Sequence, residues 1–385
     1  MKKLIIVVCL LIAVSSHPGY AEKNSPALSI NHIMADIGNV ILELYPLIVA
    51  QREFSEKETE QVSQALSKLS DLFRAAKPFI DVKPDGYQIS YEFVSQYLTI
   101  VKTELKTSGI DSVRSQLYAL GEICISCHTQ DTTLRTLFSG TTRKDISSDY
   151  AFAEFNYMTR NYDDAVKYYD EYLMSSKPKT ELDIIQPLQR IVTIYIQIRN
   201  ELRDGLNLLK KYTSLKQHTP ETRAEVENWI IGLEGLESDG VSNLAVDKYE
   251  TLQTYIDKYL GAVEKNSQYT QFTAKEEVAR VWLRGQLYHY LNKQPSENEV
   301  PMLLYWLSVA DRSVAYNYYF SLADLYLKRC VLKYPKHPYA QRCFDEYKNY
   351  VNYTYLRQGE KIPQSIVQEI IKMHAALVES KNNGQ

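Results

Sequence analysis

The pentapeptide Cys124-Ile125-Ser126-Cys127-His128 decides how the rest of this sequence is interpreted. It has the C-x-x-C-H pattern of covalent haem c attachment, in which two thiols form thioether bonds to the haem vinyl groups. Two cysteines three residues apart on a helix face the same side, and the next residue can turn in under the porphyrin. The pattern predicts one covalent haem c held by Cys124 and Cys127, with His128 as an iron ligand.

Three other interpretations of the pentapeptide remain open: a redox dithiol, half of a zinc site, or a chance match. A thioredoxin-type dithiol needs a strand-to-helix context, which the surrounding sequence does not show. A zinc site needs a second pair of ligands, and the other cysteines form no second C-x-x-C.

Residues 1–21 have the features of a secretory signal peptide. A cationic start is followed by an apolar run over 4–14, and the small-residue ending predicts cleavage after Ala21. The apolar run is short for a transmembrane helix, so an uncleaved anchor is the lesser alternative, and no later segment is expected to span a membrane. We therefore expect a soluble, exported protein in a bacterial periplasm, the compartment where covalent haem attachment is normally completed.

The composition predicts an all-α protein. Only 14 glycines and 13 prolines interrupt the 385 residues, and the apolar positions recur with helical spacing over long segments. The formal net charge of −3 provides no bulk attraction to nucleic acid or to an anionic membrane.

Residues 29–132 contain four apolar seams with helical spacing, as an antiparallel four-helix bundle requires. The seams start at Ile30, Val62, Val94 and Val113. Ser29 or Asn31 is expected to cap the first helix, and the segment 78–86 to separate the second from the third. The last seam runs into Cys124 and Cys127, so the haem is expected to hang from the buried face of the fourth helix.

Met34 is the predicted sixth ligand of the iron. It lies about one turn into the first helix, on the apolar seam, and the start of the first helix lies beside the end of the fourth in such a bundle. A thioether is a suitable soft ligand opposite His128. The alternatives are ordinary core packing of Met34 and ligation by His32, which lies on a polar stripe expected to face water.

These features resemble the class II c-type cytochromes, the cytochrome c prime family. The stretch 33–38, Ile-Met-Ala-Asp-Ile-Gly, is similar to the Met-x-x-Ile-Gly pattern of that family's first helix, and 65–76 resembles its second helix. The resemblance implies electron transfer where the helix-one methionine ligates the iron, and gas binding where it does not. The segment 129–132 departs from the aromatic and basic ending of many members.

Residues 133–148 are interpreted as a linker, and 149–358 as tetratricopeptide-like helical repeats. The segment Tyr162–Leu173 resembles such a repeat, because Ala165 supplies the small residue and Tyr169 the aromatic one in its second helix. Further helix pairs are expected over 182–197 with 201–215, 222–236 with 245–259, 275–291 with 300–311, and 316–334 with 338–351. Such a series is typical of a solenoid. Residues 359–385 are expected to form a C-terminal helix and tail.

Cys330 and Cys343 lie nearly equidistant from the turn at 335–338, on two antiparallel helices. They are therefore expected to face each other as a disulfide, with two buried free thiols as the alternative. The 31 tyrosines gather in the repeat region, where they can serve either as core or as a partner-binding groove.

The favoured function is an exported mono-haem cytochrome that transfers single electrons and docks a redox partner through its repeats. The sequence contains no recognisable set of catalytic residues, so we do not expect an enzyme. A haem peroxidase of the two-haem kind would need a second C-x-x-C-H. The alternatives are a five-coordinate, gas-binding haem protein and an interaction scaffold with structural haem.

Overall fold

The computed structural model describes residues 29–49, 54–107, 110–130, 146, 148–213, 219–241, 246–261, 274–312, 321–356 and 359–382. Every element in these ranges is a helix, which confirms the predicted all-α class. The predicted signal peptide and nearly all of the predicted linker lie outside the described residues.

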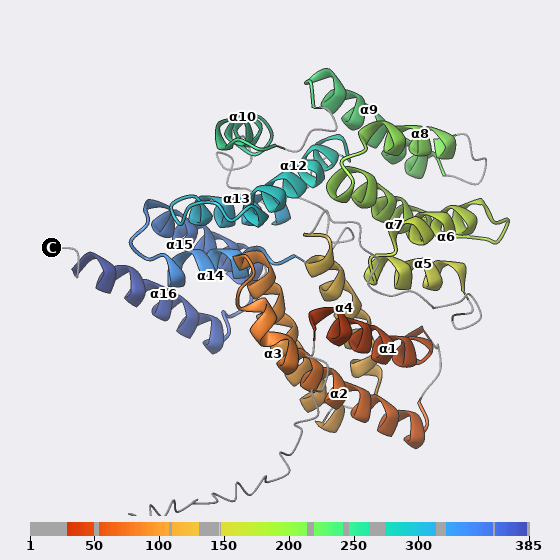
Figure 1. The fold of residues 1–385 in the computed structure, drawn as a ribbon, viewed down its shortest axis with the longest axis horizontal. Coiled ribbons are helices and arrows are strands. Elements are labelled where there is room, and N and C mark those ends of the chain that lie inside the picture. The colour runs from red at the N-terminus through yellow and green to blue at the C-terminus, as the bar shows by residue number, and fades with distance from the viewer. Residues whose placement is uncertain are drawn as a thin grey trace, which may run out of the picture.

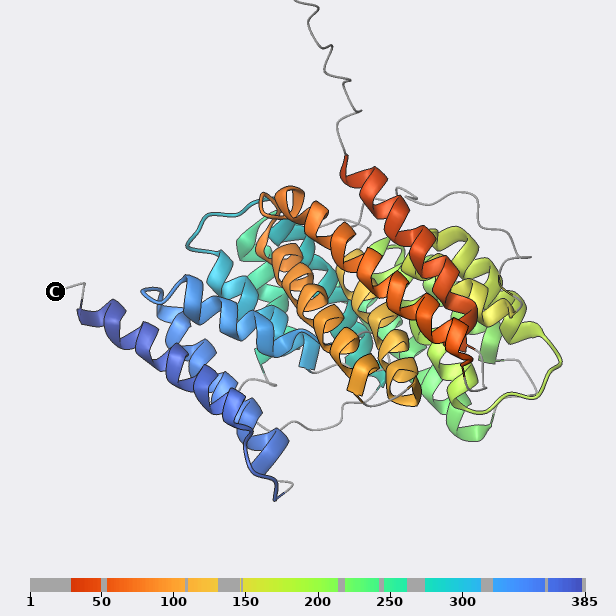
Figure 2. The same ribbon diagram turned by 90° about the horizontal axis from the view of Figure 1, so that it is seen from below.

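The first four helices are α1 (Ile30–Val49), α2 (Glu56–Ile80), α3 (Asp85–Thr107) and α4 (Ile110–His128). Each packs against the next, and α1 also packs against α4; Figure 2 shows them side by side. The seam residues point inward, with Val40, Leu66 and Val101 fully buried. Burial of these seams therefore accounts for the packing of the four helices.

Local signals explain where these helices begin and end. The Ser29 hydroxyl accepts a hydrogen bond from the His32 N–H at 3.4 Å, so Ser29 rather than Asn31 caps α1. Ser55 and Glu58 form a capping box at the start of α2. Pro78 lies inside the last turn of α2, and the helix ends at Ile80. The break before α3 is therefore shorter than the sequence indicated.

The remaining helices form a second, longer series. Its elements are α5 (Asp149–Met158), α6 (Tyr162–Met174), α7 (Leu182–Val192), η1 (Thr193–Ile198, a π-helix), α8 (Leu202–Thr213), α9 (Pro220–Ser238), α10 (Tyr249–Tyr259), α12 (Ala274–Asn292), α13 (Val300–Arg312), α14 (Ala323–Lys333), α15 (Pro338–Val351), η2 (Asn352–Leu356) and α16 (Gln364–Asn382). Neighbours pack in succession as α5 on α6, α8 on α9, α9 on α12, α13 on α14 and α14 on α15. The main packing partner of α10 is α12, whereas the sequence had paired its segment with that of α9.

The two series share one hydrophobic core. Helix α5 packs on α4, and α14 packs on α3, so both early and late helices of the second series contact the first four (Figure 1). At the α5–α6 interface the small residues Ala153 and Ala165 and the aromatic Tyr169 are fully buried. The small side chains allow α5 and α6 to pack closely.

Cys330 of α14 and Cys343 of α15 form the predicted disulfide, with their Cα atoms 6.4 Å apart. Both residues are fully buried. Their helices run antiparallel on either side of the Pro335–Pro338 turn, which places the two cysteines at the same level.

Candidate functional site

A cavity lies between α1, α2, α3, α4 and the end of α5. Its empty volume is ≈ 750 Å³, and part of that volume is open to solvent. Met34, Cys124, Cys127 and His128, the four predicted site residues, all line it. The other lining residues are mostly apolar and are Ile37, Gly38, Ile41, Phe73, Ile80, Ser90, Tyr91, Val94, Met158 and Thr159.

The two cysteines of the pentapeptide present reduced thiols to this cavity. Both lie on α4, three residues apart, so they occupy the same face of the helix. Burial raises the pKa of the Cys124 thiol to about 12, and the neighbouring Cys127 adds to that rise. The thiolate is the reactive form of a redox dithiol, and a thiol that is protonated at neutral pH is a poor nucleophile. The surroundings of Cys124 therefore argue against a thioredoxin-type activity.

The imidazole of His128 is oriented by a residue from the second helix series. Its Nδ1–H donates a hydrogen bond to the backbone carbonyl of Met158, at the end of α5, over 2.5 Å. A neutral imidazole that carries its proton on Nδ1 has its lone pair on Nε2. That is the tautomer in which a histidine binds iron through Nε2, with a backbone carbonyl as the supporting acceptor.

Met34 lines the cavity from α1, on the seam that faces the other three helices. It is half-buried and packs against the hydrophobic core. His32, the rival ligand, is exposed and shares a hydrogen bond with the Ser29 hydroxyl at 2.9 Å. The structure thus brings Met34 to the same cavity as His128 and leaves His32 at the surface.

Met158 is a cavity residue that the sequence reasoning missed. Besides accepting the bond from His128, it lines the cavity, and its sulfur would lie 3.6 Å from a Cβ built on Gly121 of α4. Nothing in the local sequence marks this methionine, because it reaches the pentapeptide only through the packing of α5 on α4.

A buried ionic cluster lies behind the cavity wall. Arg190 of α7, fully buried, pairs with Glu154 of α5 at 3.3 Å and with Glu122 of α4. The hydroxyl of Tyr169 donates to Glu154 at 2.5 Å, and the Arg190 guanidinium lies 5.3 Å from the centre of the Tyr157 ring. Burial raises the pKa of Glu122, and Arg190 opposes that rise. The cluster ties α4 to α5 and α7 just before Cys124.

Glu122 and Glu154 also line a second cavity, of ≈ 390 Å³ empty volume, next to the first. Ile41 and Met158 belong to the walls of both cavities. The cavity that these carboxylates line therefore adjoins the one lined by the cysteines and His128.

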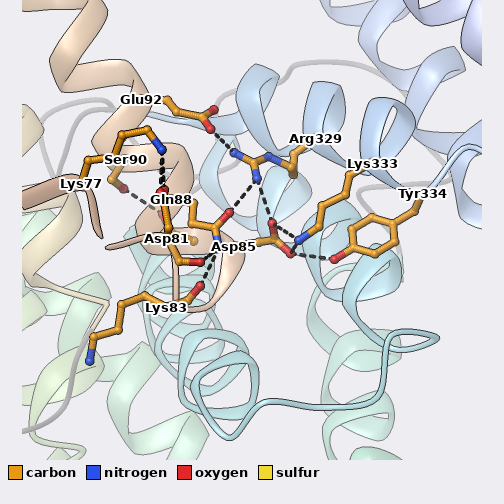
Figure 3. A network of polar contacts seen from close by, with 11 residues as sticks. Lys77, Asp81, Lys83, Asp85, Gln88, Ser90, Glu92, Arg329, Lys333 and Tyr334 are labelled. Carbon is orange, nitrogen blue, oxygen red and sulfur yellow. Dashed lines mark hydrogen bonds and ion pairs between the residues drawn. The ribbon is translucent and has the colours of Figure 1, made fainter. Parts of the chain in front are cut away.

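A second polar network fixes the helix that forms the opposite wall (Figure 3). Asp85, in the first turn of α3, accepts bonds from Arg329 at 3.0 Å, Lys333 at 2.9 Å and Tyr334 at 2.7 Å, all from α14 or its end. The negative charge also suits the N-terminal end of a helix. Because α3 carries Ser90, Tyr91 and Val94 of the cavity wall, this network places that wall relative to the second series.

The remaining histidines do not add to the site. His289 lies beside Asp247, His337 caps α15, and the His374 ring lies at a tilt beside Phe344. His17 and His218 lie outside the described residues. Within the described ranges, no three His, Cys, Asp or Glu side chains are grouped as a metal-ligand set. A haem iron takes four of its ligands from the porphyrin, so it needs no such group.

Comparisons with protein-family models, curated proteins and solved structures found no match for this chain. Among the helices of the described residues, none is both long and apolar enough to cross a membrane.

Proposed function

We propose that this protein is an exported c-type cytochrome of the cytochrome c prime kind, which carries one haem c and transfers single electrons. One observation carries the proposal: the two thiols, the imidazole and the thioether predicted from the sequence line one cavity. The wall is otherwise mostly apolar, which suits a porphyrin face.

Each residue has a distinct role in the proposed site. Cys124 and Cys127 would hold haem c as thioethers, His128 would bind the iron through Nε2, and Met34 would supply the sixth ligand. When bound, haem c would supply the centre that accepts and donates single electrons. The chain itself orients the imidazole through the Met158 carbonyl.

The second helix series has a proposed role as a tetratricopeptide-like region that docks a redox partner or a larger assembly. The helix pairing from α5 onward and the buried Ala153, Ala165 and Tyr169 support this proposal. The proposed function involves neither a nucleic-acid partner nor a membrane span, and the expected location of the protein is the periplasm.

The decisive experiment is an optical spectrum of the full-length protein, expressed with an export signal in cells competent in cytochrome c maturation. Spectra are recorded oxidised, reduced, and reduced with carbon monoxide. Sharp low-spin bands on reduction, a weak far-red band on oxidation and no response to carbon monoxide are expected. Covalent attachment is checked by haem staining after denaturing electrophoresis.

Three other outcomes would change the proposal. A high-spin spectrum that shifts at once with carbon monoxide would remove Met34 from the iron and favour a gas-binding protein. Haem that is attached but dispensable for binding a partner would favour a scaffold with structural haem. Protein without haem absorbance from such cells would contradict the electron-transfer function.

A further inference from the structure

The end of α4, directly after the pentapeptide, is held by side chains from three later elements. The Thr129 carbonyl accepts a bond from the Gln197 amide at 2.9 Å, and the Gln130 carbonyl accepts one from Asn292 at 2.7 Å. The Tyr162 hydroxyl lies 3.4 Å from the His128 carbonyl. The carbonyls at the C-terminal end of a helix have no partner within that helix. Here the carbonyls of His128, the last residue of α4, and of Thr129 and Gln130 just beyond it are satisfied by α6, η1 and α12.

Gln197 reaches this turn from a local distortion of the helix. It lies in η1, the π-helical continuation of α7, and is 1% exposed. Gly285 of α12 lies directly against it, since a Cβ on Gly285 would be 2.6 Å from the Gln197 carbonyl oxygen. Single turns of π-helix are rare and frequently occur at functional sites. Only a residue without a side chain at position 285 lets α12 approach this turn.

The orientation of the Gln197 amide is determined by a buried ion pair. Arg284 donates from Nη1 to the Gln197 Oε1 at 3.0 Å and from Nε to Asp311 at 2.6 Å. The side chains of Arg284 and Asp311 are fully buried. A guanidinium has no acceptor, so it must face the amide oxygen, and the NH₂ group of Gln197 is thereby directed to the Thr129 carbonyl.

We propose that Gln197 and Asn292 are positioning residues for His128, and that they fix the turn that presents its imidazole to the cavity. This inference rests on the proposed haem site. A histidine that ligates iron affects the metal through the orientation and the basicity of its ring. Groups outside the ligand shell determine both properties. The Met158 carbonyl holds the ring, while Gln197 and Asn292 hold the backbone from which the ring extends.

The test compares full-length, haem-loaded Gln197→Leu with Gln189→Leu as its matched control. Gln189 is equally buried and lies about two turns earlier on the same continuous helix. Amide hydrogen exchange is followed for the peptide covering 124–130, and the electron paramagnetic resonance spectrum of the oxidised protein is recorded. For Gln197→Leu we expect roughly three- to tenfold faster exchange in this peptide, because the peptide loses the hydrogen bond to its Thr129 carbonyl. The resonance positions should also shift.

Gln189→Leu should leave both the exchange of 124–130 and the resonance positions as in the wild type. Unchanged exchange and resonance positions in haem-loaded Gln197→Leu would overturn the inference, as would faster exchange spread evenly over all helices. If Gln197→Leu does not fold, Asn292→Ser provides the same measurement on the Gln130 carbonyl with the same two outcomes. A wild type that carries no haem would contradict the proposed function instead, so the two failures are distinguishable.

Discussion

The chain contains two cysteine pairs within its described residues, and they differ in almost every physical respect. Cys124 and Cys127 lie three residues apart on one helix and present reduced thiols to an apolar cavity. Cys330 and Cys343 lie on two antiparallel helices, fully buried, and are bonded to each other. The first pair faces space that a ligand can fill, and the second faces only its own partner.

This difference shows that the surroundings of a cysteine, more than its presence, indicate its role. The bonded pair is enclosed by a packed hairpin, with the Cys330 sulfur 3.7 Å from the carbonyl oxygens of Pro301 and Tyr339. The first pair is followed by a histidine that α5 and α6 contact directly, and by a turn whose carbonyls are bonded by η1 and α12. We therefore expect substitutions at the two pairs to have effects of different kinds.

The largest expected effect is the loss of covalent haem. The double substitution Cys124→Ser and Cys127→Ser should abolish haem staining on denaturing gels, because a hydroxyl forms no thioether. Cys330→Ala with Cys343→Ala should retain full staining per folded molecule. Equal staining of the two double variants would mean that haem attachment, if any, does not use the pentapeptide.

The second expected effect is on stability and belongs to the other pair. Removing the Cys330–Cys343 bond should lower the free energy of unfolding by about 2–4 kcal/mol, because the bond restricts the unfolded chain. Denaturant unfolding followed by circular dichroism measures this change. Reduction of the wild type should reproduce the loss, and an unchanged midpoint in both cases would show that this bond adds no stability.

The third prediction concerns Met34, which lines the same cavity as the first cysteine pair. Met34→Leu nearly preserves side-chain volume but removes the thioether. We expect the haem to remain attached, the spectrum to become predominantly high-spin, and the reduction potential to fall, since a methionine ligand raises it. His32→Ala is the control, because His32 is exposed on the same helix. A low-spin Met34→Leu protein that ignores carbon monoxide would remove Met34 from the ligand set.

The sequence could predict the parts that depend on near neighbours. Apolar spacing identified the helices of both series, and the symmetric placement of Cys330 and Cys343 about their turn identified the hairpin. Met34 and His128 were associated because an antiparallel bundle brings the start of its first helix to the end of its fourth. In each case the spacing along the chain determines the geometry.

Contacts between distant segments were beyond such reasoning. Gln197 reaches Thr129 through a π-turn that no local signal marks, and Asn292 reaches Gln130 from a helix far along the chain. The departure at 129–132 from the expected family ending did mark this region as unusual. The carbonyls of Thr129 and Gln130 are bonded by residues of the second helix series, and a sequence pattern within 29–132 does not include those residues.

The smallest expected effect concerns the charged residue that lies next to each cysteine pair in the sequence. Glu122, two residues before Cys124, lies in the buried cluster with Arg190, whereas Arg342, next to Cys343, lies 4.5 Å from the centre of the Tyr339 ring. Burial is the largest influence on Glu122 and raises its pKa. The folded state therefore binds this proton more tightly than the unfolded state.

The sign of the resulting pH dependence follows from linkage. The stability that Glu122 contributes is fully present below the ordinary glutamate pKa of about 4.3 and is lost as the pH rises through the raised pKa of the folded state. The free energy of unfolding of the wild type should therefore fall relative to that of Glu122→Gln over this range. Each unit of pKa difference corresponds to about 1.4 kcal/mol.

Urea unfolding of both proteins between pH 4 and pH 7 measures this difference, with Glu43→Gln, an exposed carboxylate on α1, as the control for loss of a surface charge. A wild type that gains stability over Glu122→Gln as the pH rises would show that pairing with Arg190 outweighs burial. In that case the ion pair of Glu122 and Arg190 beside Cys124 would stabilise the folded protein, despite the cost of burying its charges. The surroundings of the two cysteine pairs would then differ less in their effect on stability than their burial and charge indicate.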